Sequence, residues 1–112
     1  MLASRNYIIL NKPIAKILGI NASIMLGELC SEYEYWKSTD QLDEEYFYST
    51  AQNIREHTTL TRKSQDSAIG KLKEYGIIET KLMGLPARRY FKINQEKIGE
   101  LLYMQDCPSG TN

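Results

Sequence analysis

The segment from Thr61 to Gly76 carries side chains whose type and spacing suit contact with a charged partner. It reads TRKSQDSAIGKLKEYG, and its less polar positions recur every three or four residues, so they share one face of a helix. That inward face is predicted to consist of Gln65, Ala68, Ile69 and Leu72. The opposite face offers ammonium, guanidinium and hydroxyl groups, which donate hydrogen bonds to phosphates and to base edges. The candidate binding residues on it are Arg62, Lys63, Ser64, Ser67 and Lys71.

Residues typical of helix ends mark both limits of this segment. Thr61 offers a hydroxyl that caps a helix start, and Gly76 suits the left-handed turn that closes a helix. A shorter helical pattern, Ser49 to His57, precedes it across a tight turn at 59–61. A short helix, a turn and a longer helix with small polar and basic residues outward are typical of a helix-turn-helix. An ordinary amphipathic surface helix would also show this pattern, so the rest of the chain must decide.

After Gly76 the period of the apolar residues changes from helical to alternating, which predicts a β-hairpin. Its two strands, Ile77 to Leu82 and Arg88 to Ile93, flank the turn Gly84 to Ala87. The register that gathers the apolar residues pairs Ile78 with Ile93, Thr80 with Phe91 and Leu82 with Arg89. The same register sets Glu79 opposite Lys92 and Lys81 opposite Tyr90.

This hairpin carries a second group of basic side chains. Its candidate binding residues are Lys81, Arg88, Arg89 and Lys92. The overall net charge is zero, but the segment from Arg55 to Lys97 holds ten Lys and Arg against five Asp and Glu, whereas the residues before Arg55 hold four against seven. Such asymmetry indicates a polyanionic partner for the helix pair and the hairpin. A basic surface that is merely solvated is the alternative.

The remaining segments predict the other elements of one domain. Helices are expected at Lys12 to Gly19, at Asn21 to Lys37 with Asn21 as its cap, and at Gln95 to Tyr103 after the cap residue Asn94. The apolar stripe of the long helix is core, or core plus a dimer seam: Ala22, Met25, Leu26, Leu29, Tyr33 and Trp36. Tyr46 to Tyr48 fits a single short strand, and Asn6 to Leu10 fits an edge strand or an extended arm.

A helix-turn-helix followed directly by a hairpin and preceded by a short strand is the winged-helix plan, mainly α with a small antiparallel β-hairpin. We expect residues 1–104 to form this domain and residues 105–112 to be a disordered tail or the start of a linker. The run from Phe47 to Asn94 resembles the winged-helix domains at the amino termini of plasmid replication initiators and phage replisome organisers from low-GC Gram-positive bacteria. The motifs TLTRKSQDSAIGKLKEYGIIE and GLPARRYFKIN carry the resemblance, over a little under half of the chain.

The resemblance implies sequence-specific binding to double-stranded DNA at an origin or operator, as part of a plasmid or phage replication initiation protein with replication proteins as partners. Many such proteins carry a larger carboxy-terminal region. Two alternatives stay open: a transcriptional regulator of a mobile element, and a winged helix used for protein contact. The last is supported by the acidic first half and by the aromatic residues Tyr33, Tyr35, Trp36, Tyr46 and Tyr48.

A homodimer is a further hypothesis, because DNA-binding modules of this kind often read pseudo-palindromic sites. Its candidate surface is formed by Asn6 to Leu10, the Asn21 helix and the last helix.

Other function classes find little support in the composition. No apolar run approaches the roughly 20 residues of a membrane helix, and the amino terminus lacks the order of a secretory signal. Cys30 and Cys107 match no metal or redox spacing, so Cys30 is expected in the core of a cytoplasmic protein. His57 is interpreted as a helix-end residue favoured by the helix dipole, and a single histidine suggests no metal site. With no phosphate loop or catalytic arrangement, we expect neither an enzyme nor a cofactor.

Overall fold

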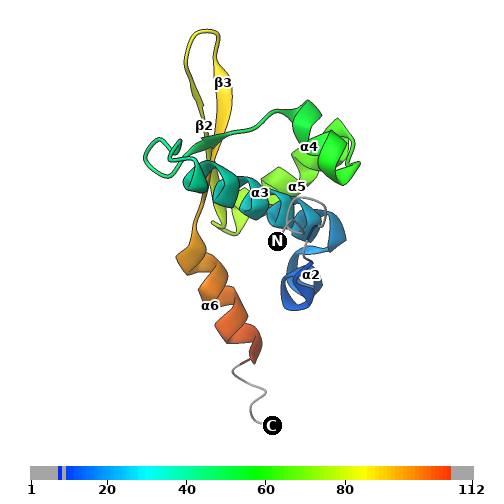
Figure 1. The fold of residues 1–112 in the computed structure, drawn as a ribbon. Helices are drawn as coiled ribbons and strands as arrows, with labels where there is room; N and C mark the ends of the chain where they lie inside the picture. The colour runs from blue at the N-terminus through cyan, green and yellow to red at the C-terminus, as the bar shows by residue number, and fades with distance from the viewer. Residues whose placement is uncertain (1–7, 9, 107–112) are drawn as a thin grey trace.

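The structure, a computed structural model, describes residue 8 and residues 10–106. In that part of the chain the elements are α2 (Lys12–Leu18), α3 (Ile20–Ser38), β1 (Phe47–Tyr48), α4 (Ala51–Thr58), α5 (Arg62–Glu74), β2 (Ile78–Met83), β3 (Arg88–Ile93) and α6 (Gln95–Asp106). The three strands form one antiparallel sheet in the order β1-β3-β2. The chain is therefore mainly helical with a small sheet, as predicted, and has the winged-helix fold. In Figure 1 the β2–β3 hairpin and α6 project from the helical body in opposite directions.

The core lies around α3, which packs against α2, α4, α5 and the sheet. Met25 and Leu29 of α3 and Leu72 of α5 are fully buried, and Phe47 of β1 stacks on Phe91 of β3 with ring centroids 6.1 Å apart. Burying side chains of this size contributes about 1.5–3 kcal/mol each. The predicted stripe of α3 is confirmed as core, with Trp36 half-buried at its end.

The boundary between α2 and α3 differs from the prediction. Gly19 stands at the N-cap of α3 with φ of 96°, and α3 starts at Ile20 without a side-chain cap. Asn21 already lies inside the first turn and is exposed, so the prediction that it caps the helix is wrong. The reason is the single residue between the two helices. Glycine tolerates the positive φ that redirects the chain there, which leaves no room for a further cap residue.

Each helix of the helix-turn-helix starts with a threonine cap, and the predictions for Thr61 and Gly76 are confirmed. The Thr50 hydroxyl accepts a hydrogen bond from the Asn53 amide at 3.0 Å, and the Thr61 hydroxyl accepts one from the Ser64 amide at 3.2 Å. Gly76 follows α5 with φ of 74°, in the left-handed region. Each threonine satisfies a backbone N–H at the helix start that the helix itself leaves unpaired, and it stabilises the helix by about 1 kcal/mol. Local sequence therefore sets the limits of both helices.

The hairpin register agrees with the prediction at every pair that was named. Ile78 lies opposite Ile93, Thr80 opposite Phe91, Leu82 opposite Arg89, Glu79 opposite Lys92, and Lys81 opposite Tyr90. The short aromatic strand is also confirmed, because β1 pairs with β3 at Phe47 and Phe91.

The last helix is longer than predicted. The Asn94 side chain accepts a hydrogen bond from the Lys97 amide at 3.1 Å, as a cap should, but α6 continues past Tyr103 to Asp106. Only composition marked the predicted end, and the polar residues after Tyr103 do not stop a helix. Residues 107–112 lie outside the described part, as does most of the strand or arm expected at Asn6 to Leu10. Among the described residues, no helix has the length and apolar character needed to span a membrane.

Candidate nucleic-acid interface

The outward face of α5 presents the predicted polar and basic side chains to solvent. Arg62, Lys63, Ser67 and Lys71 are exposed, and Ser64 is half-buried. Arg62 forms an exposed ion pair with Asp66 of the next turn, with Nε and Oδ1 3.4 Å apart. The Thr61 hydroxyl donates to the Ser64 hydroxyl at 3.2 Å, so Ser64 belongs to the cap of the helix. Lys63 and Ser67 lie in the amino-terminal half of this exposed face.

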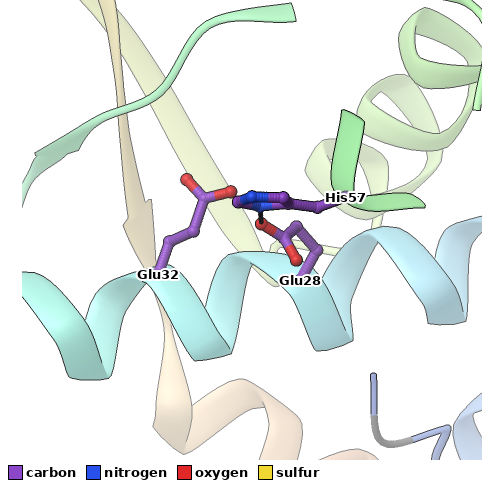
Figure 2. Close-up of side chains that lie close together, drawn as sticks. All are labelled: Glu28, Glu32 and His57. Carbon is purple, nitrogen blue, oxygen red and sulfur yellow. Dashed lines mark hydrogen bonds and ion pairs between the residues drawn. The ribbon is translucent and has the colours of Figure 1, made fainter. Parts of the chain in front are cut away.

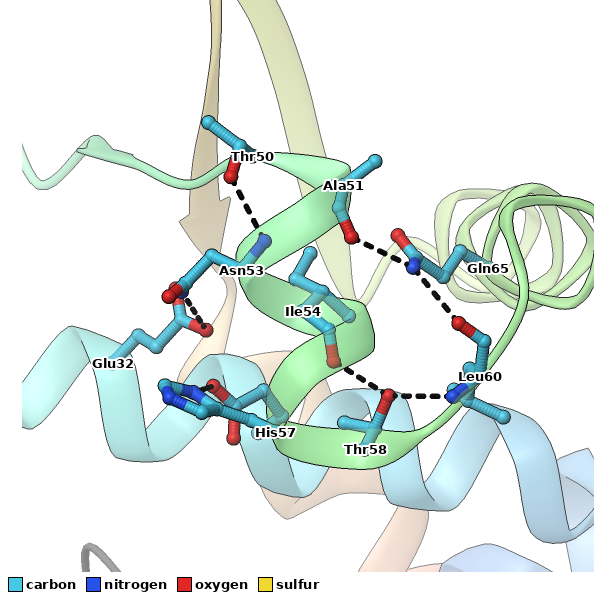
Figure 3. A network of polar contacts seen from close by, with 10 residues as sticks. Glu32, Thr50, Ala51, Asn53, Ile54, His57, Thr58, Leu60 and Gln65 are labelled. Carbon is cyan, nitrogen blue, oxygen red and sulfur yellow. Dashed lines mark hydrogen bonds and ion pairs between the residues drawn. The ribbon is translucent and has the colours of Figure 1, made fainter.

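The buried side of the helix pair fixes the angle at which α5 is presented. Gln65 is fully buried, and its Nε2 donates to the carbonyl oxygens of Ala51 at 2.9 Å and Leu60 at 3.1 Å. The Thr58 hydroxyl donates to the Ile54 carbonyl at 2.7 Å and accepts from the Leu60 amide at 3.1 Å. Figure 3 shows these contacts joining α4, the turn and α5. The orientation of the exposed face of α5 is thus held by specific hydrogen bonds rather than by apolar packing alone.

The structure divides the four predicted wing cations between two faces of the sheet. Side chains alternate along a strand, so Arg89 lies on the face of Phe91 and Ile93, which packs on the helices. Arg88 and Lys92 lie on the opposite face of the same strand, together with Lys81 of β2. The prediction from sequence assigned all four cations to the hairpin without separating Arg89 from the other three.

Arg89 is the wing cation on the face of the sheet that packs on the helices. It is half-buried, with its guanidinium 4.9 Å from the centre of the Phe91 ring. Its pKa is lowered by burial and, secondarily, by the positive charge of Arg62, while Asp66 acts in the opposite sense. Charges at the start of α5 therefore influence Arg89, which lies on the helix-facing side of the wing.

The outer face of the sheet combines cations with tyrosines. Lys81 and Lys92 lie 4.3 and 5.7 Å from the centre of the Tyr46 ring. Arg88 lies 5.2 Å from the centre of the Tyr48 ring. Cation–π contacts of this kind contribute about 0.5–1 kcal/mol at exposed sites and restrict where each charge is presented.

Sequence reasoning missed a polar cluster between α3 and α4. His57 does stand in the last turn of α4, but its Nδ1 lies 2.8 Å from Oε2 of Glu28, a residue of α3. Glu32, one turn further along α3, accepts a hydrogen bond from the Asn53 side chain at 3.3 Å. Figure 2 shows both carboxylates directed toward the imidazole. The spacing of Glu28 and Glu32 was the available signal, but His57 is distant from both in sequence.

Burial of this cluster perturbs its acid–base chemistry. Glu28 and Glu32 are only 5% and 8% exposed. The pKa of Glu32 is raised to about 8, mainly because burial disfavours its charge, and also because of its hydrogen bond to Glu28 and the charge of Glu28. The Ser49 hydroxyl and His57 act in the opposite direction. The Glu32 carboxyl therefore holds its proton more readily than an exposed glutamate does, unless a cation lies nearby.

Cys30 is half-buried and packs against the core, as expected. The pKa of its thiol is raised to about 11, first because of burial and then because of the negative charge of Glu34. The reactive thiolate form is therefore disfavoured.

Comparison with known proteins identifies the fold. No family model matches the sequence, and no curated protein matches it significantly. A solved structure described as "N-Terminal domain of DNA binding protein" is similar, with a TM-score of 0.64 over 88% of this chain and 86% of that chain. The sequence identity is 14%, so the likeness concerns the fold.

Proposed function

We propose that this protein is a sequence-specific double-stranded DNA-binding module that places α5 in the major groove. The observation that carries the proposal is the exposed face of α5, which presents Arg62, Lys63, Ser67 and Lys71 to solvent. Arg89 of the wing lies on the face of the sheet that packs on the helices. A major groove about 12 Å wide admits one helix, and short polar and basic side chains near the helix start reach base edges. Lys63 and Ser67 would make such contacts, with Lys71 directed toward phosphate.

The wing would extend the contact along the DNA backbone. Arg89 lies on the side of the sheet that faces the helices, so it is positioned to contact a duplex already held by α5. Arg88, Lys81 and Lys92 lie on the other face, where they would neutralise phosphates of a flanking segment. Phosphate contacts fix the position of the module, and α5 supplies the discrimination between sequences.

The fold likeness to a domain of a DNA-binding protein supports this proposal. The resemblance to plasmid replication initiators and phage replisome organisers supports a finer one, in which the module recognises a replication origin and recruits replication proteins, itself without catalytic activity. A homodimer would let two modules read a two-fold symmetric site.

A second function, protein contact, is favoured by the outer face of the sheet. Tyr48 and Tyr90 pack there with ring centroids 5.7 Å apart, beside Tyr46. All three tyrosines are half-buried, and tyrosine is enriched at protein interfaces.

Binding selection from random duplexes, followed by sequencing, tests the proposed function. We expect enrichment of a defined sequence and a binding constant that falls with salt, with a log–log slope near −0.9 for each phosphate neutralised. Lys16→Ala is the control for a general loss of positive charge. Lys16 is exposed on α2, which packs against α3 and α6 and carries none of the proposed binding residues. Absence of both enrichment and salt dependence would leave the protein-contact function as the better proposal.

A further inference from the structure

Two elements bring a set of metal-ligating side chains together. Glu28 and Glu32 stand one turn apart on α3, and His57 stands in the last turn of α4. One ligand atom from each lies within 4.8 Å of the others. Both carboxylates are buried, and a buried pair of carboxylates is costly unless a positive charge or a proton lies between them. Figure 2 shows the three side chains converging.

Ser49 also faces this site. It is 3% exposed, and its Oγ lies near enough to Glu32 to lower the pKa of that carboxyl, but within the described part of the chain it forms no well-oriented hydrogen bond. Ser49 lines a cavity of about 400 Å³ together with Glu28, Glu32 and His57. A buried hydroxyl in native proteins usually has a well-oriented partner, and a group bound in the cavity would complete the hydrogen bonding of Ser49.

We propose that Glu28, Glu32 and His57 bind a divalent transition-metal ion, with Zn²⁺ the best fit. Two carboxylate oxygens offset the charge of the ion, and an imidazole nitrogen favours zinc over calcium or magnesium, which prefer oxygen ligands alone. Three protein ligands leave one coordination position for water or a small anion, which the cavity accommodates. The Ser49 hydroxyl is placed to hydrogen-bond that fourth ligand.

The geometry requires only small movements of side chains. In a tetrahedral zinc site with bonds of about 2.1 Å, ligand atoms are about 3.4 Å apart. The candidate ligand atoms now lie within 4.8 Å of one another, and rotation of the glutamate side chains would bring them to the shorter separation. Asn53 already donates to Oε2 of Glu32 at 3.3 Å and so orients that carboxylate, as outer-shell residues do in metal sites. The ion would take the place of the direct contact between His57 and Glu28.

A metal here would join α3 to α4, the first helix of the helix-turn-helix. The proposal does not depend on DNA binding, and its test contains no DNA. Thermal unfolding of the untagged, chelator-treated protein is measured with and without added Zn²⁺. At a free zinc concentration of about 100 times Kd, we expect the midpoint to rise by about 10 °C.

Matched variants locate the site. Glu28→Gln and Glu32→Gln keep the shape of the side chain but lose the charged ligand, so the zinc-induced rise should disappear in both. Glu34→Gln removes an exposed carboxylate from the same helix, and Cys30→Ser and Cys107→Ser remove the thiols; these three variants should keep the rise. No rise in the parent protein, or a rise retained in both cluster variants, would overturn the proposal.

A second measurement does not depend on whether the variants fold. The chain contains one histidine, so the imidazole signals in a ¹⁵N NMR spectrum belong to His57 alone. Zinc bound at this site should shift the His57 Nδ1 resonance, saturating at one equivalent. Imidazole signals that do not respond to zinc would contradict the assignment even if the metal raised the unfolding midpoint.

Discussion

The helix pair α4–α5 has two polar sides, and they differ in where their partners lie. On the buried side, Gln65 and Thr58 hydrogen-bond to backbone groups of other parts of the same unit. On the exposed side, Lys63, Ser67 and Lys71 extend into solvent. Similar polar side chains on the two sides therefore have different roles. The buried ones determine how α5 is held, whereas the exposed ones are available to an external partner.

The largest expected effect belongs to the buried side. Gln65→Ala removes two hydrogen bonds, leaves the Ala51 and Leu60 carbonyl groups without this donor, and opens a cavity. We expect the free energy of unfolding to fall by about 3 kcal/mol, measured by chemical denaturation. Ser67→Ala, two residues away on the exposed face, should change it by less than about 0.5 kcal/mol. Equal effects of the two substitutions would show that the two sides are not energetically distinct.

Thr58 provides a finer test of the buried side. Thr58→Val keeps the shape of the side chain but leaves the Leu60 amide without its partner at the turn. We expect a loss of about 1–3 kcal/mol of unfolding free energy. Thr58→Ser retains the hydroxyl and should preserve most of the stability. A valine variant as stable as the parent would mean that the turn is fixed by packing alone.

The exposed side should respond in binding rather than in stability. Lys63 lies near the start of α5, where base edges would be within reach. Lys63→Ala should cost about 1–3 kcal/mol on the preferred duplex and much less on random DNA, measured by fluorescence anisotropy. Its unfolding free energy should stay close to that of the parent protein. If the variant binds both duplexes like the parent, α5 is not the reading element.

The wing should show a weaker, unspecific effect. Arg88→Ala should weaken binding to preferred and random duplexes alike, by about 1 kcal/mol near 0.1 M salt, and flatten the salt slope by about one unit. Arg89→Met keeps the apolar stem over the Phe91 ring and removes the positive charge. Because Arg89 lies on the α5 side, we expect its loss to weaken binding more than the loss of Arg88. The reverse order would place the duplex against the outer face of the sheet.

The comparison of the two sides also explains what the sequence could predict. Helix caps, the helical period of α5 and the alternation in the hairpin are local patterns, so the Thr61 cap and the named pairs of the hairpin register were predicted correctly. The cluster of Glu28, Glu32 and His57 was not, because a glutamate on a helix is ordinarily solvated and its burial depends on another element packing over it. The division of Arg88 and Arg89 between two faces follows from the predicted register, but which face meets the helices requires the tertiary structure.

The smallest effect concerns Gly70, which lies on the exposed face of α5 and has no atom within 4 Å of the place a Cβ would occupy. Glycine inside a helix costs about 1 kcal/mol relative to alanine, so Gly70→Ala should stabilise the protein by about 0.5–1 kcal/mol. The free protein gives no steric reason for glycine at this position. If glycine serves the close approach of a sugar-phosphate backbone to α5, the same substitution must weaken DNA binding while it raises the free energy of unfolding.

Gly99 supplies the matched control, because it is exposed in α6 and likewise has open space where a Cβ would stand. Gly99→Ala should stabilise the protein by a similar amount and leave DNA binding unchanged, since α6 projects away from the wing (Figure 1). Denaturation and duplex binding measured on both variants separate helix propensity from contact with DNA. If Gly70→Ala binds DNA as tightly as Gly99→Ala does, the backbone of α5 does not approach the duplex at Gly70, and the contact is confined to the first turns of the helix.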